Sequence, residues 1–335
     1  MITYYPIDKK LSKSHCNLED LLFTHSGKSS LSIILNFLRK KNYIINKASE
    51  VLMNKWIGNE VYKSVLNFSS FKTDLSKNLK VMICYHQYGY PQDLEKITSY
   101  CEDKKIFLIE DCAHVLESYY KDKKLGTFGE ISFYSFSKFI YCGTLGGIKV
   151  NNQDLKDEFN LLYNEMLKNS YSILEKLHIS QKYLYSISEK KNYKKIKNLL
   201  SISERAFYSL SDKMLKPSQK SKKILINYFN SEIEIRKKFK NILFSEIKNQ
   251  DYFEPIYNDN VVPYAVPLFS SEEKLDKIKA KLRELDFECD IFHFDINRSL
   301  LSPNFKKCVL IPLSYASENN YFYLEKIINA INSIE

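Results

Sequence analysis

Two stretches decide the fold of this chain, Phe107-Leu-Ile-Glu-Asp-Cys-Ala-His114 and Ile131-Ser-Phe-Tyr-Ser-Phe-Ser-Lys138. The first is an apolar run that stops at two carboxylates, Glu110 and Asp111, and the second ends at a lysine. Buried parallel strands read as continuous apolar runs, and open α/β sheets bind ligands at the carboxyl ends of their strands. We therefore expect an acid and a lysine to meet at one edge of a sheet.

The residues before the first stretch complete a strand-helix-strand unit. Val81–Tyr88 reads as a strand, Gly89-Tyr-Pro91 as a turn, and Asp93–Asp103 has helical spacing before the strand Ile106–Glu110. Short connections of this kind are typical of a parallel sheet flanked by helices. The chain is therefore predicted to have an α/β fold.

The last third of the chain predicts a second, smaller α/β unit. A strand is expected at Val261–Phe269, and a long helix at Ile224–Ile247 leads toward it. With 335 residues the chain is long enough for two such units. We expect a large domain over residues 1–235, which includes a helical, lysine-rich segment at 154–215, and a small C-terminal domain over residues 236–335.

The net charge and the cysteine content indicate which partners and which cell compartment to expect. The formal net charge is +10, but the excess is nearly all lysine in segments that read as solvated helix faces, so no nucleic-acid partner is expected. No apolar run is long enough to span a bilayer and no secretory signal is recognisable, so no membrane partner is expected. The seven cysteines are scattered without a Cys-x-x-Cys pair, which predicts reduced thiols in a cytoplasm and no metal site.

A turn of small residues near the N-terminus is a candidate anion site. It reads Phe23-Thr-His-Ser-Gly-Lys-Ser-Ser30 and runs into a segment with helical apolar spacing. Free N–H groups at a helix start and the aligned peptide dipoles favour negative charge. Gly27-Lys28-Ser29 also resembles the end of a nucleotide-binding P-loop, but that motif requires a glycine at the position of Leu22. The remaining alternative is a helix N-cap without a ligand.

Together these features match what pyridoxal phosphate needs from a protein. The cofactor takes a lysine as a Schiff base, an acid against its ring nitrogen, an anchor for its phosphate and a flat group stacked on its ring. The candidates are, in that order, Lys138, Asp111, the turn Ser26–Ser30 and Trp56, the only tryptophan. The alternatives are a sheet with ordinary charged strand ends and, for Trp56, a place in the core.

Several blocks of the sequence occur in the order seen in one enzyme family. They are Glu110-Asp-Cys-Ala-His114, Gly126-Thr-Phe-Gly129, Ser135-Phe-Ser-Lys138 and Gly146-Gly147, preceded by His25-Ser-Gly-Lys-Ser-Ser-Leu31 and Asn54-Lys-Trp56. This pattern resembles the DegT/DnrJ/StrS family of sugar aminotransferases. Its members typically carry a phosphate turn, a ring-stacking aromatic, Glu-Asp-x-Ala-Gln, Gly-x-x-Gly, Ser-Phe…Lys and Gly-Gly.

The resemblance implies a role for each matching residue around the cofactor ring. Lys138 is expected as the catalytic Schiff-base lysine, Asp111 as the catalytic partner of the ring nitrogen, and Trp56 as the stacking residue. His114 stands where the family has a glutamine near the phenolic oxygen of the cofactor, and either side chain donates that hydrogen bond. The alternative for His114 is a hydrogen bond to a loop carbonyl.

The same resemblance implies a phosphate site. Gly27, Lys28 and Ser29 are expected to hold the phosphate through backbone and side-chain donors, with Ser135 as a further contact. The block that begins at Ser135 is two residues shorter than in many relatives, so Ser137 is an alternative contact. A core position without a ligand is the other alternative for Ser135.

The implied fold is that of the type I pyridoxal-phosphate-dependent transferases, which resemble aspartate aminotransferase. It has a large domain with a mostly parallel seven-stranded sheet, a small C-terminal α/β domain, and active sites at a homodimer interface. The implied reaction moves an amino group, from L-glutamate, to a keto group of a nucleotide-linked deoxysugar for polysaccharide or glycan precursors.

Three alternatives to this reaction stay open. They are a pyridoxal-dependent sugar dehydratase, an aminotransferase of another small carbonyl compound, and a catalytically silent protein with this fold. Some relatives replace the lysine with histidine and dehydrate sugars, so the presence of Lys138 favours transamination.

Overall fold

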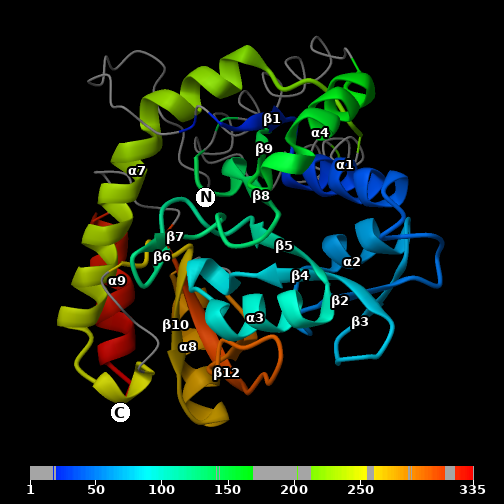
Figure 1. Ribbon diagram of the computed structural model, residues 1–335. Coiled ribbons are helices and arrows are strands. Elements are labelled where there is room, and N and C mark those ends of the chain that lie inside the picture. Colours follow the sequence, from blue (N-terminus) through cyan, green and yellow to red (C-terminus); the bar gives the residue numbers. More distant parts are fainter. Residues whose placement is uncertain are drawn as a thin grey trace.

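A seven-stranded sheet dominates the computed structural model (Figure 1), which describes residues 18, 20–140, 142, 144–168, 202, 213–254, 260–285, 287, 289–313 and 321–334. In spatial order the strands are β1 (Leu22–Thr24), β9 (Gly146–Val150), β8 (Ile131–Ser135), β5 (Phe107–Cys112), β4 (Leu79–Tyr85), β2 (Glu50–Met53) and β3 (Ser70–Lys72). β9 runs antiparallel to β1 and β8, and the other neighbours are parallel. The predicted mostly parallel seven-stranded sheet is confirmed.

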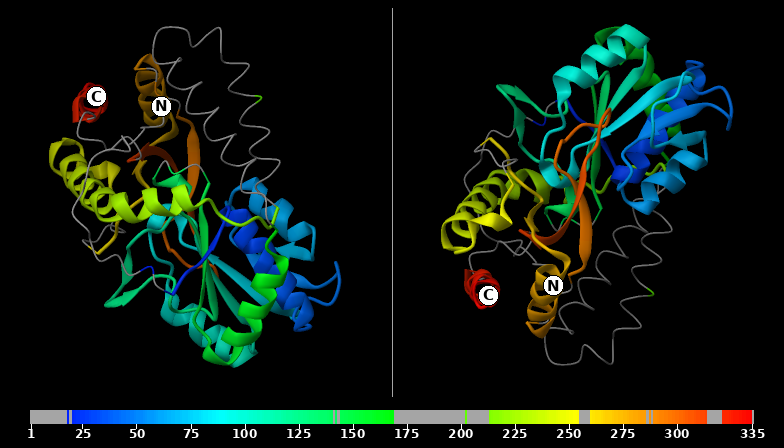
Figure 2. Two further views of the ribbon diagram at one scale, coloured as in Figure 1. Left: turned by 90° about the horizontal axis from the view of Figure 1, so that it is seen from above. Right: turned by 90° about the horizontal axis from the view of Figure 1, so that it is seen from below.

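Helices cover both faces of this sheet. On one face lie α1 (Gly27–Lys40), α2 (Asn59–Leu66) and α4 (Gln153–Met166), and on the other lie α3 (Leu94–Lys104) and the first half of α7 (Gln219–Glu246). Figure 2 shows α1 and α4 on the side of the sheet opposite α7. The large domain is therefore a three-layer α/β/α structure.

The alternation of side chains along each strand explains why the central strands read as continuous apolar runs. In β4, Val81 and Ile83 belong to the core beneath α1, whereas Met82 and Cys84 belong to the core beneath α3. Successive residues of a strand point to opposite faces, so a strand covered on both sides needs apolar residues at every position. All four of these side chains are fully buried.

A second sheet of three antiparallel strands follows in the chain. Its order is β10 (Ala265–Phe269), β12 (Phe305–Pro312) and β11 (Ile291–Asp295). The helices α8 (Glu272–Glu284) and α9 (Tyr321–Asn332) pack with it, and Figure 1 shows α9 beside α7. The predicted smaller C-terminal unit of strands and helices is thus present.

The long helix α7 contacts both units. Its first half contributes Leu225 and Phe229 to the core of the large sheet, and its second half contributes Phe239 and Leu243 to the core of the small sheet. The proposed domain limit after residue 235 falls inside this helix and stays a prediction. Of the lysine-rich segment 154–215, the part up to Met166 is helical in α4, and most of the rest lies outside the described residues.

Short elements complete the described chain. They are the hairpin β6 (Tyr119–Tyr120) and β7 (Lys123–Lys124) and the 3-10 turns η1 (Gln87–Gly89), η2 (Phe136–Lys138) and η4 (Gln250–Tyr252). Among the helices that the structure describes, none is both long enough and apolar enough to cross a bilayer.

Candidate active site

The carboxyl ends of β4, β5 and β8 lie side by side and bring the predicted acid and lysine together. In the sheet register Asp111 lies between Tyr85 of β4 and Phe133 of β8. β8 ends at Ser135 and η2 follows at once, so Lys138 lies just beyond the sheet edge. The charge of Lys138 lowers the pKa of Asp111, and the charge of Asp111 raises that of Lys138. The two groups are therefore electrostatic neighbours.

Asp111 is a buried carboxyl group that is easily protonated. Burial raises its pKa from 3.8 to about 6, against the opposing effects of Lys138, the Ala113 N–H and His86. The Ala113 N–H donates to Oδ1 of Asp111 at 2.9 Å. A carboxyl group in this state gains much from a neighbouring cation, because the cation restores the ionised form that burial disfavours.

Lys138 combines an accessible surface with a perturbed amine. The residue keeps solvent-exposed area, yet protein atoms crowd its amine, and this desolvation lowers the pKa of Lys138 although Asp111 opposes the shift. An accessible amine with a lowered pKa is nucleophilic over a wider pH range than an ordinary lysine. Its Nζ lies 2.9 Å from Nε2 of His114.

His114 is held by side chains on all sides. Its Nδ1 lies 2.5 Å from the hydroxyl of Tyr85, and its ring stacks on Tyr264 with a centroid distance of 4.2 Å and an interplanar angle of 6°. Tyr88 stacks with the same ring at 5.6 Å. Burial, and then the charges of Lys138 and Arg236, hold the pKa of His114 well below its usual value. The ring nitrogens thus meet side chains of the site rather than a loop carbonyl.

Glu110, next to Asp111 in the same strand, has a structural role. Its Oε1 accepts hydrogen bonds from the N–H groups of Phe128 and Gly129 at 2.6 and 2.8 Å. Its Oε2 accepts from the Gly126 N–H at 2.8 Å and pairs with Nε2 of His86 at 3.0 Å. Burial disfavours its charged form, but these donors outweigh burial and lower the pKa of Glu110. The carboxylate therefore clamps the Gly126–Gly129 turn to the sheet.

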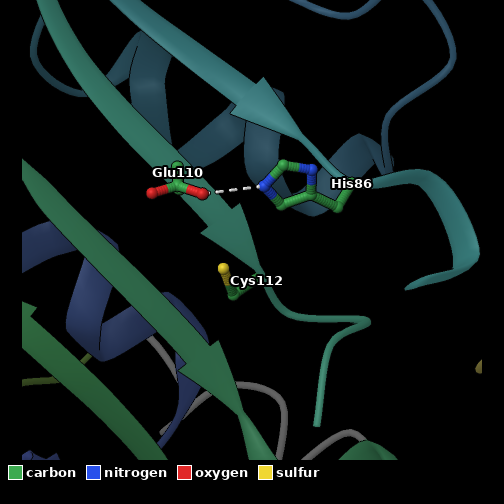
Figure 3. Close-up of side chains that lie close together, drawn as sticks. All are labelled: His86, Glu110 and Cys112. Carbon is green, nitrogen blue, oxygen red and sulfur yellow. Dashed lines mark hydrogen bonds and ion pairs between the residues drawn. The ribbon is translucent and has the colours of Figure 1, made fainter. Parts of the chain in front are cut away.

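His86, Glu110 and Cys112 form a buried cluster that has the residue types of a metal site (Figure 3). The hydrogen bonds argue against that use. Both oxygens of Glu110 already serve several donors, and the Gln92 N–H donates to Nδ1 of His86, so Nε2 carries the proton that it gives to Glu110. Burial also raises the pKa of the Cys112 thiol. The absence of a metal stays a prediction.

The predicted anion turn lies against the end of β8. Ser26 is the N-cap of α1, and its hydroxyl accepts from the Ser29 N–H at 3.0 Å. A methyl group built on Gly27 would come within 2.8 Å of Cβ of Ser135, and one built on Gly146 within 2.4 Å of the Ser26 backbone. The glycines therefore let the start of α1, the end of β8 and the start of β9 approach closely, which places Gly27 beside Ser135.

Two side chains of this turn behave differently. The hydroxyl of Ser29 is buried and has no hydrogen-bond partner among the described residues. Such an orphan at a helix start is what a missing anion would leave. Lys28 instead directs its Nζ to Glu60 of α2, with an N–O distance of 3.0 Å. The phosphate role of the Lys28 side chain stays a prediction, and so does the role of Ser137.

Trp56 is 44% exposed, so the core interpretation of this tryptophan is wrong. Its ring stacks on His293 of β11 at a centroid distance of 4.0 Å and an angle of 6°, and meets Phe305 of β12 edge-on. In the described structure these ring contacts tie the end of β2 to the small sheet. The predicted stacking on a cofactor ring stays untested.

Sequence reasoning missed Tyr85, Tyr264 and Arg236. Arg236 is buried in α7, pairs with Glu232 at 2.7 Å and donates to the carbonyl of Tyr264 at 3.1 Å. Tyr85 lies in the second half of the strand predicted over Val81–Tyr88, and that position could have placed it near the site. No sequence signal marks Tyr264 or Arg236, because they reach His114 and its surroundings only through the packing of the two units.

One hollow of the described surface lies away from the carboxyl ends of the strands. A cavity of about 460 Å³ lies at the opposite end of the sheet, where Phe107, Glu130 and Asn151 line it. None of the predicted site residues contributes to its wall. The titratable groups whose charges shift one another's pKa values, Asp111 and Lys138 together with His114, converge at the carboxyl ends of the strands instead.

A comparison with protein families matches the part of the chain that carries the candidate site. Residues 61–181 match the model of the DegT/DnrJ/EryC1/StrS aminotransferase family. GDP-perosamine synthase of Escherichia coli O157:H7 is 37% identical over 94 residues, which are 28% of this chain and 26% of the relative. The enzyme of the same name from Vibrio cholerae is 36% identical over 86 residues, 25% of this chain and 23% of the relative. The chain thus spans about a quarter of the length of these relatives.

Solved structures extend the likeness to nearly the whole chain at low identity. A DegT DnrJ EryC1 StrS aminotransferase from Brucella abortus has a TM-score of 0.60 at 14% identity, covering 93% of this chain and 84% of its own. An E. coli GDP-4-keto-6-deoxy-D-mannose-3-dehydratase with bound hydrated PLP has a TM-score of 0.63 at 12% identity, covering 93% and 87%. The predicted type I fold and the resemblance to the family are confirmed, the latter over the region that carries Asp111, His114 and Lys138.

Proposed function

We propose that this chain is a pyridoxal-phosphate-dependent aminotransferase that places an amino group on the keto group of a nucleotide-linked deoxysugar, with L-glutamate as the donor. One observation carries the proposal, namely the accessible Lys138 amine with a lowered pKa beside the buried carboxyl group of Asp111. The site region matches the aminotransferase family, and the fold is that of its solved members.

The residues present fit the cofactor. Its phosphate would lie at the start of α1, where the hydroxyl of Ser29 is buried without a hydrogen-bond partner among the described residues. A Cβ added to Gly27 at this point would collide with Ser135. Asp111 would face the ring nitrogen, because a pyridinium supplies the cation that its raised pKa calls for. His114 would lie near the phenolic oxygen, and Trp56 would stack after leaving His293.

These contacts suggest a separate role for each residue of the site. When bound, pyridoxal phosphate supplies an aldehyde that joins to amines and a ring that accepts electrons from the adjacent carbon. Asp111 would hold the proton on the ring nitrogen and so keep the ring cationic. Lys138 would hold the cofactor through its amine, and that amine would move a proton at the donor's α-carbon. The helix dipole of α1 would fix the phosphate end.

The substrate proposal rests on two of the relatives that match part of this chain. They are GDP-perosamine synthases, whose name describes the synthesis of a GDP-linked sugar. We extend this only to the class of nucleotide-linked deoxysugars that feed polysaccharide or glycan precursors. Lys138 favours amination over dehydration, because it keeps the amine that a transaminase needs for proton transfer.

A homodimer in the cytoplasm completes the proposal. Six cysteines in the described residues are free thiols, as expected in a reducing compartment. The dimer is expected from the resemblance to the family, whose active sites lie between subunits. Light scattering of the purified full chain tests the dimer directly.

Absorbance spectra of the purified chain with pyridoxal phosphate, titrated with L-glutamate, test the reaction class. The proposal predicts a band of bound cofactor that shifts from the aldehyde form to the amine form. Lys138→Ala should lose the initial band, and Lys149→Ala, a partly buried lysine of β9, should keep it. No band in the wild type would favour a catalytically silent protein, and a band that glutamate leaves unchanged would favour the dehydratase alternative.

A further inference from the structure

A chain of three side chains runs from the sheet into the candidate site. The hydroxyl of Tyr85 lies 2.5 Å from Nδ1 of His114, and Nε2 of His114 lies 2.9 Å from Nζ of Lys138. Both ring nitrogens of His114 are therefore engaged, one by a phenol and one by the amine proposed to be reactive. Tyr85 itself is fixed at the end of β4, where its N–H donates to Oδ1 of Asn54 at 2.9 Å.

The contacts determine which nitrogen of His114 carries the proton. While Lys138 carries its charge, its ammonium has donors and no acceptor, so Nε2 accepts the hydrogen bond from Lys138 through its lone pair. A neutral imidazole has one N–H, which then lies on Nδ1 and donates to the oxygen of Tyr85. If Nε2 carried the proton, two donors would face each other across 2.9 Å.

The surroundings keep the ring neutral and in place. The charged groups that face the ring are Lys138 of η2 and Arg236 of α7, both cations that disfavour a second proton on His114, and Asp111 of β5 lies near Lys138. The phenols of Tyr88 and Tyr264 stack on the ring and restrain its tilt. These neighbours fix the charge and the orientation of the His114 ring, so only its tautomer is left to determine.

We propose that Tyr85 is a positioning residue, which holds His114 in the Nδ1–H tautomer and thereby keeps Nε2 as the acceptor for the amine of Lys138. Tyr85 touches neither the amine nor, in this arrangement, a substrate, and it acts through His114 alone. The inference deepens the proposed function, because it gives the lysine of that same site its hydrogen-bond acceptor. Its test can nevertheless be made without the cofactor.

The experiment follows the protonation of Lys138 in cofactor-free protein. Acetic anhydride acylates neutral amines, so mass spectrometry of the peptide that contains Lys138 gives the pH at which labelling is half-maximal. In Tyr85→Phe the Nδ1–H has no acceptor, the Nε2–H tautomer gains weight, and the ammonium form of Lys138 loses its acceptor. A charge-assisted hydrogen bond corresponds to about one pH unit, so the midpoint should fall by roughly that amount.

His114→Gln provides the matched control. A glutamine offers its carbonyl oxygen to Lys138 by amide orientation, without a tautomer for Tyr85 to select. Tyr85→Phe should therefore shift the labelling midpoint in the wild-type background and leave it unchanged in the His114→Gln background. An unchanged midpoint in the wild-type background, or an equal shift in both backgrounds, would overturn the proposal.

A measurement on the unaltered protein covers the case in which Tyr85→Phe does not fold. The ¹⁵N chemical shifts of the His114 ring in the full-length, cofactor-free chain report the tautomer directly. The Nδ1–H form is expected, and the Nε2–H form would refute the inference. Failure of the wild type to bind pyridoxal phosphate would remove the proposed function, whereas labelling and ring shifts would still decide the role of Tyr85.

Discussion

Replacement of Glu110 by glutamine should lower the stability of the fold, although Glu110 makes no hydrogen bond to the amine of Lys138. In the native structure each carboxylate oxygen serves two donors: the Phe128 and Gly129 N–H groups on Oε1, and the Gly126 N–H and His86 on Oε2. An amide keeps one oxygen and presents an NH₂ group at the other position. Two donors would then face that NH₂ group in a fully buried site.

The size of the effect follows from these contacts. Loss of two hydrogen bonds to a buried charged acceptor corresponds to about 3 to 6 kcal/mol. We therefore expect Glu110→Gln to lower the free energy of unfolding by about 4 kcal/mol and the melting temperature by roughly 5 to 10 °C.

Thermal unfolding followed by circular dichroism at several pH values measures both the size and the pH dependence. Because the folded state lowers the pKa of Glu110, its stabilising contribution is present above the ordinary glutamate pKa and is lost as the pH falls through the lowered value. The stability gap between wild type and Glu110→Gln should therefore shrink on acidification below about pH 4.

Glu165→Gln is the control for that experiment, since Glu165 pairs with Lys40 at 3.3 Å on the surface. It should leave the melting temperature within about 1 °C of the wild type. A melting temperature of Glu110→Gln equal to that of this control, or a gap that grows on acidification, would refute the clamp.

Three further predictions follow from the site. Asp111→Asn should abolish the spectral change with glutamate but raise the melting temperature of the cofactor-free protein above pH 6. Burial raises the Asp111 pKa from 3.8 to about 6, so the ionised carboxylate costs roughly 3 kcal/mol of folding free energy. Because the carboxyl group is protonated in both states at low pH, the difference in melting temperature should vanish near pH 4. Gly27→Ala, whose Cβ would meet Ser135 at 2.8 Å, should weaken binding of pyridoxal phosphate about tenfold or more in a fluorescence titration, whereas Gly58→Ala, whose Cβ meets open space, should not. Pyridoxal phosphate should quench the fluorescence of Trp56 if that ring leaves His293 to stack on the cofactor, and unchanged emission on saturation would contradict the stacking role.

The local parts of the site were accessible to sequence reasoning. Asp111 lies near the end of one strand and Lys138 follows the end of its parallel neighbour, and the chain direction of such strands places their carboxyl ends at the same edge. Gly27 lies in a turn of small residues that the sequence placed before a helix, and the structure has this turn at the start of α1. These features depend on a few consecutive residues and on the regular geometry of strands, so they can be read without knowledge of the packing.

Other features required the packed molecule. The adjacent acids Glu110 and Asp111 look equivalent in the sequence, but a strand points successive side chains to opposite faces, and only the packing shows that Glu110 meets His86 and the Gly126–Gly129 turn. Tyr264 covers His114 from 150 positions away in the chain, and Trp56 meets His293 in the other sheet. What the sequence by itself determined was the central strands and the residues that end or follow them, because local pattern encodes both. The partners of those residues were decided by tertiary structure, because hydrogen bonds and ring contacts depend on how distant segments pack.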